Sequence, residues 1–147
     1  MSRKKAVYSV HLARILGGHA DEVRETGRWH DHILEGLSFD GVERIKAHAS
    51  LTDAELARLL GIGEATLRRA RAAGGTLDST TSDRLYRLAK VIAIAEEVLE
   101  STANAMTWLR RPQPALGGKV PLDLLTTEAG ADEVETLLRR IDYGVYT

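Results

Sequence analysis

The chain contains no cysteine among its 147 residues. This absence excludes disulfide bonds, thiolate nucleophiles, iron–sulfur clusters and cysteine-based zinc sites. Long apolar runs are also missing, since no window approaches the roughly 20 apolar residues that span a bilayer. The basic residues 3–5 resemble the start of a signal peptide, but Ser9, His11 and Arg14 interrupt the segment that follows. We therefore expect a cytoplasmic protein without membrane contact.

Aromatic residues make up only 5% of the chain, and β-branched residues are few beside Ala, Leu, Arg and Glu. Alanine and unbranched side chains lose little rotamer freedom in a helix. No segment alternates between apolar and polar residues over a useful length. From Ile33 onward, apolar residues recur instead at helical spacing, so the sequence predicts an all-α fold.

The chain has no excess of either charge, with 20 basic and 21 acidic side chains and a net charge of −1. Residues 1–80 carry twelve basic and eleven acidic side chains, and residues 81–147 carry eight and ten. Neither part is a uniformly basic nucleic-acid coat, so any DNA contact must come from a local patch.

The turn-rich segment from Gly74 to Thr81 is the expected domain boundary. It separates an N-terminal helical region, residues 1–80, from a second helical domain, residues 81–147. The expected helices cover about 6–16, 38–49, 52–60, 64–73, 83–100, 103–111, 121–125 and 127–143. Ser82 or Thr81 is the expected cap of the long helix 83–100, and Thr52 with Glu55 forms a capping box before the helix 52–60.

Residues 52–73 fit a helix-turn-helix. In a twenty-residue frame that begins at Asp53, Ala57 occupies the helix crossing, where a large side chain would clash. Gly61 occupies the turn position that needs a positive φ. Five further positions must be apolar to hold the two helices together, and all are: Leu56, Leu60, Ile62, Leu67 and Ala70.

This frame places Thr66, Arg68 and Arg69 on the outer face of the second helix, which would enter the major groove of DNA. Arg68 or Arg69 could read a guanine edge, and Arg71 could meet phosphate. So few cations imply weak binding by a monomer, and we therefore expect a homodimer on palindromic operator DNA. The alternative is a packed helical hairpin whose arginine face is only solvated.

The second half of the chain contains a series of segments in a characteristic order: SDRLYRLA (82–89), AIAEEV (93–98), AMTWL (105–109), RPQPALGG (111–118), PLDLL (121–125), TEAG (127–130) and IDYGV (141–145). They cover nearly all of residues 82–147. In these segments the chain resembles the toxin-binding domain of Xre/MbcA/ParS-type antitoxins. The resemblance extends to the helix-turn-helix, because this family joins an Xre-like DNA-binding region to that domain.

The resemblance implies an antitoxin of a type II toxin–antitoxin system. Its partner would be a RES-domain toxin that depletes NAD, and the antitoxin would block the active site of that toxin and repress its own operon. Gly63, Glu64 and Ala65 depart from the more polar, uncharged turn usual in the family, which bears on operator affinity more than on toxin binding. The alternative is a helix-turn-helix regulator whose C-terminal helices serve dimerisation or ligand sensing.

Three groups of residues in the second half are candidates for toxin binding. Leu116, Gly117 and Gly118 can bring backbone close to a partner, because glycine lacks a Cβ. Trp108 is a typical interface anchor, although a Trp on an amphipathic helix is more often core. The end of the chain is the third group, unless it folds back on its own helices: Tyr143, Gly144, Val145 and Tyr146.

No motif predicts catalysis, a metal or a cofactor. The segment around Gly117-Gly118-Lys119 lacks the first Gly and the Ser or Thr of a phosphate loop. The pair His30 and His32 has no third ligand at helical spacing. The Gly-x-Ser-x-Gly elbow of a serine hydrolase is also missing. The neighbouring carboxylates Glu96 and Glu97 are interpreted as solvated surface, and we expect a binding protein rather than an enzyme.

Overall fold

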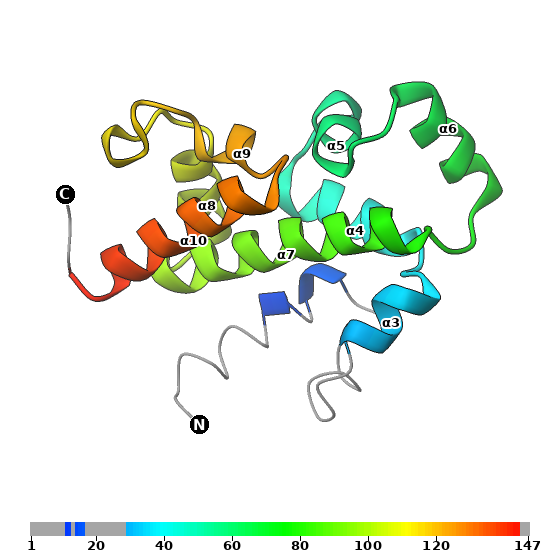
Figure 1. Cartoon of the computed structure of the whole chain (residues 1–147), viewed down its shortest axis with the longest axis horizontal. Helices are drawn as coiled ribbons and strands as arrows, with labels where there is room; N and C mark the ends of the chain where they lie inside the picture. The colour runs from blue at the N-terminus through cyan, green and yellow to red at the C-terminus, as the bar shows by residue number, and fades with distance from the viewer. Residues whose placement is uncertain (1–10, 13, 17–28, 145–147) are drawn as a thin grey trace.

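The computed structural model describes residues 11–12, 14–16 and 29–144. Figure 1 labels its helices: α3 (Trp29–Glu35), α4 (Asp40–Ala49), α5 (Asp53–Leu60), α6 (Glu64–Ala73), α7 (Ser79–Leu99), α8 (Thr102–Leu109), the 3-10 turn η1 (Pro114–Leu116), α9 (Pro121–Leu124) and α10 (Glu128–Asp142). Residues 11–12 and 14–16 are also helical. Within these ranges there is no strand, only two isolated β-bridges, so the predicted all-α fold is confirmed. No helix in the same ranges is long and apolar enough to cross a membrane.

The start of α7 corrects the predicted cap. Asp78 is the N-cap residue, and its carboxylate accepts the N–H of Thr81 at 2.7 Å. Thr81 and Ser82 are buried within the first turn. The Oγ atom of Ser82 accepts the backbone N–H of Leu37 at 2.8 Å, so this side chain joins α7 to the segment before α4 instead of capping its own helix.

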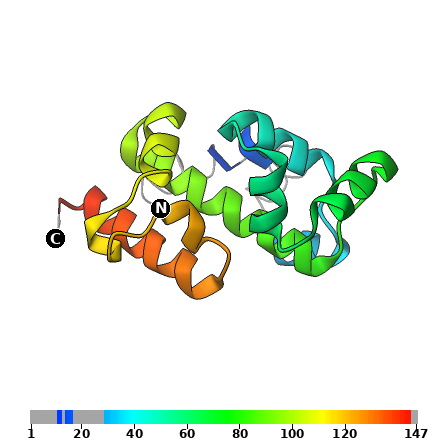
Figure 2. The same cartoon turned by 90° about the horizontal axis from the view of Figure 1, so that it is seen from above.

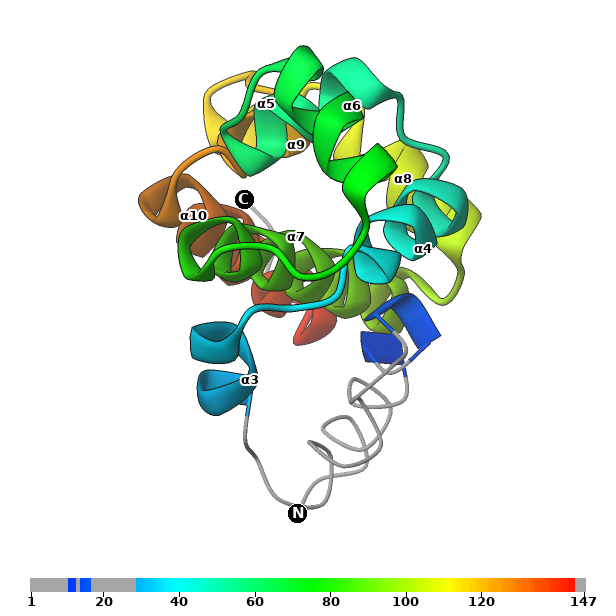
Figure 3. The same cartoon turned by 90° about the vertical axis from the view of Figure 1, so that its right-hand side faces the viewer.

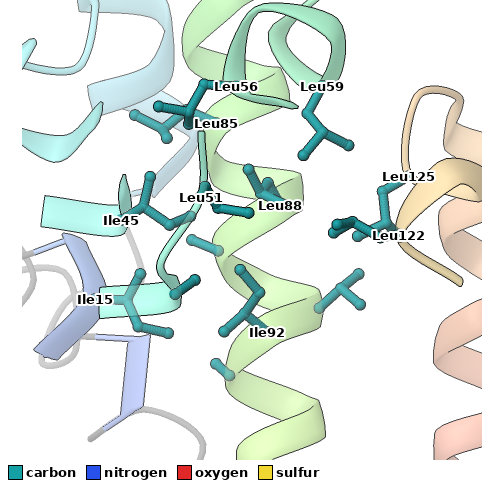
Figure 4. Packing of buried hydrophobic residues seen from close by; sticks show 14 of the residues in the cluster. Ile15, Ile45, Leu51, Leu56, Leu59, Leu85, Leu88, Ile92, Leu122 and Leu125 are labelled. Atoms are coloured by element: carbon teal, nitrogen blue, oxygen red, sulfur yellow. The ribbon is translucent and has the colours of Figure 1, made fainter. Parts of the chain in front are cut away.

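Helix α7 is the central element of the fold. It lies between α5 and α9 on one side and α3 on the other (Figures 1 and 3). Figure 4 shows side chains from α4, α5 and the α9 region converging on its residues Leu85, Leu88 and Ile92. The buried apolar residues form one cluster that spans both predicted domains. The hydrophobic core therefore continues across residues 80 and 81, and the domain boundary there stays a prediction.

Helix α10 lies alongside the second half of α7 (Figure 2), where Lys90 Nζ is 3.5 Å from Glu135 Oε2. Its N-cap is Thr127, whose Oγ1 atom accepts the N–H of Gly130 at 2.9 Å. A Cβ at Gly130 would lie only 2.0 Å from the carbonyl oxygen of Leu124. Glycine is therefore required where α10 passes the end of α9.

Charged side chains join α5 to the C-terminal half of the chain. Arg58 Nη1 lies 2.9 Å from Asp123 Oδ1. Arg110, at the end of α8, binds the carboxylate of Glu55 and donates to the carbonyl oxygen of Ser50 at 3.1 Å. These contacts, together with the shared core, hold the helix-turn-helix in one orientation against α8 and α9.

The prediction that Glu96 is solvated is wrong. Its side chain is 1% exposed and is surrounded by donors from three other segments. The carboxylate lies 3.0 Å from His11 Nδ1, 2.5 Å from His48 Nε2 and 2.7 Å from Thr102 Oγ1. Burial raises the pKa of Glu96, but the hydrogen bonds from His48 and Thr102 outweigh it and lower the pKa below 4.5. Glu97 beside it is half-buried.

Candidate functional site

The helix-turn-helix has the geometry that its sequence predicts. Gly61 ends α5 with φ +70°, and its N–H donates to the carbonyl groups of Ala57 and Arg58. A Cβ at this position would lie 2.6 Å from Arg84 Nη1, so the left-handed turn and the packing of α7 both favour glycine. Arg84 also donates to the carbonyl oxygen of Leu60 at 3.3 Å. The side chain of Arg84 on α7 thus helps to hold the turn in place.

The apolar positions of the frame hold α6 against α5. Leu56, Leu60 and Leu67 are fully buried, and Ala57 at the crossing is 3% exposed. Ile62 and Ala70 are partly buried and pack against the same core. All seven steric positions of the predicted motif therefore do what the frame requires.

The outer face of α6 is open to solvent. Thr66, Arg68 and Arg69 are all exposed, as is Glu64 in the first turn. Arg69 Nη2 donates to Thr66 Oγ1 at 3.2 Å, which aligns these two side chains along the helix. Figure 1 shows α6 at one end of the molecule. Two exposed guanidinium groups on a helix of this motif form a surface suited to phosphate and to guanine edges.

Arg71 is placed differently from the other two arginines. Its Nη1 and Nη2 atoms donate to the two carboxylate oxygens of Asp53 at 3.0 and 2.8 Å, and its Nε atom donates to Glu43 at 2.8 Å. Lys46 Nζ also lies 2.9 Å from Asp53. The hydrogen bonds from Arg71 and then Lys46 hold the pKa of Asp53 far below its ordinary value. The guanidinium predicted to meet phosphate is therefore engaged within the protein.

The loop between α8 and α9 forms a second candidate surface. Gly117 and Gly118 have φ values of +68° and +79°, and a Cβ at either would meet no heavy atom within 4 Å. The N–H of Gln113 donates to the carbonyl oxygen of Lys119, and that of Gly118 donates to Gln113, each at 3.0 Å. The loop is thus closed at its base and open at its tip. Leu116 beside the glycines is half-buried.

Trp108 packs against the core and is also partly exposed, and its role in toxin binding stays a prediction. It is half-buried and packs against the core, in agreement with the structural alternative. Its exposed part lines a shallow hollow of about 260 Å³ together with Leu99, Thr107 and Arg111. Gln113 Nε2 donates to its carbonyl oxygen at 3.0 Å, which fixes the start of the loop.

A groove of about 540 Å³ runs between this loop and α10. It is lined by Ala115, Leu116, Lys119, Asp132, Glu133, Thr136, Leu137 and Arg140. Sequence reasoning missed the α10 side, because polar residues on the outer face of an amphipathic helix carry no signal for a groove. Tyr143 follows α10 and is 74% exposed, and Gly144 is also exposed. Val145 and Tyr146, predicted to bind toxin, lie outside the described residues.

The two candidate surfaces lie at opposite ends of the molecule. Figure 1 shows α6 at one end of the long axis, and the loop after α8 and the end of α10 at the other. The view from above agrees (Figure 2). In the ranges that the structure describes, no three His, Asp or Glu residues are arranged to hold a metal ion.

Comparisons with known proteins match both halves of the chain. A family model of the antitoxin Xre-like helix-turn-helix domain matches residues 28–90, and one of the antitoxin Xre/MbcA/ParS C-terminal toxin-binding domain matches residues 95–144. The short gap between the two ranges, residues 91–94, lies within α7.

Curated relatives agree with these matches. The chain is 35% identical over 118 residues to Antitoxin Xre of Yersinia enterocolitica, covering 80% of each chain. It is 30% identical over 115 residues to Antitoxin Xre of Pseudomonas putida, covering 78% of this chain and 71% of that one. It is 28% identical over 123 residues to the Prs ADP-ribosylating antitoxin of a Sphingobium species, covering 78% and 77%.

Proposed function

Because the chain belongs to the Xre family of antitoxins, with a helix-turn-helix and a toxin-binding domain, we propose that it neutralises a RES-domain, NAD-depleting toxin. It does so by covering the active site of the toxin. The observation that supports this most directly is that one end of the molecule presents three features together: the loop tip at Gly117 and Gly118, the adjacent groove, and Tyr143. This whole surface lies within residues 95–144, which match the toxin-binding domain.

The chemistry of this surface supports a protein partner. The groove is lined by two apolar side chains, Leu116 and Leu137, and by charged side chains of both signs: Lys119, Arg140, Asp132 and Glu133. Polar and charged groups next to apolar ones are typical of non-obligate protein–protein interfaces. The open loop tip lets a partner approach the backbone closely.

Co-expression with a RES-domain toxin tests the proposal. The chain should restore growth and the cellular NAD level, and it should co-purify with the toxin. Reversing two charges of the groove, with Lys119→Glu and Arg140→Glu, should weaken the complex, because both cations line the same groove. The matched control is Arg68→Glu on α6, at the far end of the molecule, which should leave toxin binding unchanged.

A toxin that neither binds the chain nor is neutralised by it would contradict this function. The result would then favour the alternative of a regulator whose C-terminal helices dimerise or sense a ligand. Measuring the mass of the free chain and its small-molecule binding would distinguish these two alternatives.

The second part of the proposed function is binding of a homodimer to palindromic operator DNA, which represses the operon. The exposed Thr66, Arg68 and Arg69 on α6 support it. A gel shift on the promoter fragment of its own operon tests it, with a scrambled fragment as the control. Equal affinity for the two fragments would contradict operator recognition.

A further inference from the structure

The C-terminal turn of α6 is tied to two other helices by one side chain. Arg71 makes a two-point contact with Asp53, the first residue of α5, at 3.0 and 2.8 Å. Its third N–H reaches Glu43 of α4 at 2.8 Å. Two parallel bonds from a planar guanidinium to a carboxylate fix direction as well as distance.

Little else fixes the angle of α6. Leu67, near the middle of the helix, is its only fully buried residue. Exposed glycines flank it at both ends, Gly63 as the N-cap and Gly74 as the C-cap with φ +67°. Ala70 also packs against the core but is only partly buried. Apolar packing therefore holds α6 mainly near its middle, and the Arg71 contacts add a directional constraint at its C-terminal turn.

The charges around Arg71 make it a poor phosphate ligand. Asp53 and Glu43 lie against its guanidinium, and Lys46 lies 2.9 Å from Asp53. The four formal charges sum to zero. To reach phosphate, Arg71 would have to leave two carboxylates, whereas the exposed Arg68 and Arg69 have no such cost in any contact that the structure shows.

We propose that Arg71 is a positioning residue for DNA binding, which sets the angle of α6 through Asp53 and Glu43 and leaves the contacts with DNA to Thr66, Arg68 and Arg69. This inference rests on the proposed operator binding. It replaces the phosphate contact that the sequence predicts for Arg71.

The test is a set of operator titrations over a range of salt concentration, with the full chain and the variants Arg71→Ala, Arg71→Lys and Asp53→Asn. A phosphate contact contributes about 0.9 to the slope of log K against log salt on duplex DNA. We expect Arg71→Ala to weaken operator binding by roughly tenfold, the scale of losing one base contact, with the slope unchanged. Arg71→Lys should fail to restore binding, because an ammonium group cannot make the two-point contact.

Asp53→Asn changes operator affinity in opposite directions, depending on whether Arg71 positions α6 or contacts phosphate. If Arg71 positions α6, Asp53→Asn weakens operator binding as much as Arg71→Ala does. The double variant with Arg71→Ala and Asp53→Asn then binds operator no more weakly than either single variant. If Arg71 binds phosphate, Asp53→Asn releases a cation and strengthens binding. Far-UV circular dichroism and toxin binding report that each variant is folded.

The inference is overturned if Arg71→Ala lowers the salt slope by about 0.9, if Arg71→Lys restores affinity, or if Asp53→Asn strengthens binding. Failure of the unaltered chain to bind operator overturns the proposed DNA function together with this inference. Arg68→Ala distinguishes failure of this inference from failure of the proposed contact between α6 and DNA. It weakens operator binding if α6 contacts DNA, whatever the role of Arg71.

Discussion

His48 and Glu96 are joined by a hydrogen bond of 2.5 Å between Nε2 and Oε2, although they are 48 residues apart in the chain. His48 belongs to α4, beside the helix-turn-helix, and Glu96 lies at the end of α7 that meets the toxin-binding region. Thr102, the first residue of α8, donates to the same carboxylate oxygen at 2.7 Å. One buried carboxylate thus links α4, α7 and α8, and we expect its negative charge to stabilise the packing of these three helices.

Replacing Glu96 with Gln should reduce stability in a pH-dependent way. The pKa of Glu96 is lowered below 4.5 in the folded protein, so the ionised group stabilises the fold. This contribution is complete above the ordinary pKa and is lost as the pH falls through the lower folded value. We expect Glu96→Gln to lower the free energy of unfolding by about 2 kcal/mol at neutral pH.

Urea unfolding of the two proteins at a series of pH values checks this. The difference should shrink as the pH falls below the ordinary pKa of a glutamate and through the lower pKa of Glu96, because Glu96 then becomes protonated in the unaltered chain as well. Glu133→Gln is the matched control, since Glu133 is exposed on α10. A difference that is constant with pH would show that the charge of Glu96 contributes nothing.

Gly130→Ala should destabilise the C-terminal half. The added Cβ would lie 2.0 Å from the carbonyl oxygen of Leu124, so α9 and α10 would have to move apart. Overpacking of this kind costs about 1–3 kcal/mol. The control is Gly63→Ala, because the nearest heavy atom to that Cβ, Thr66 Oγ1, is 4.0 Å away. Equal thermal midpoints for the two variants would contradict the steric argument.

Local spacing explains why much of the fold could be predicted. The capping box of Thr52 and Glu55 and the turn at Gly61 depend on residues a few positions apart, and both are confirmed. The burial of Leu56 and Leu67 follows from the same helical period. Features that depend on residues only a few positions apart can be predicted from a single sequence.

Long-range pairing explains what could not be predicted. Ser82 looks like a helix cap, but its hydroxyl oxygen accepts the backbone N–H of Leu37, 45 residues earlier. Arg71 looks like an exposed cation, but its partners Asp53 and Glu43 are 18 and 28 residues away. Glu96 looks solvated for the same reason. Each error concerns a polar side chain whose partner depends on how the helices pack.

Removing the residues after α10 should weaken toxin neutralisation and leave the fold intact. A chain that lacks residues 143–147 keeps all of α10, which ends at Asp142. The point variant Tyr143→Ala should weaken toxin binding by roughly tenfold or more, as expected for an aromatic anchor at an interface. Leu34→Ala is the matched control, since Leu34 is also a large exposed side chain, at 62% against 74% for Tyr143. Equal toxin affinity for both variants would exclude Tyr143 from the interface.

Replacing Arg68 and Arg69 together with Ala should abolish operator binding and spare toxin binding. Both side chains are exposed on α6, so their loss removes charge without opening the core. Toxin binding should persist because the loop after α8 lies at the other end of the molecule (Figure 1). Loss of a phosphate contact would lower the salt slope by about 0.9, whereas loss of a base contact would relax sequence preference at constant slope. Titrations of the single variants Arg68→Ala and Arg69→Ala on operator and scrambled DNA therefore assign each arginine to one kind of contact. An unaltered gel shift of the double variant would mean that another surface meets the DNA.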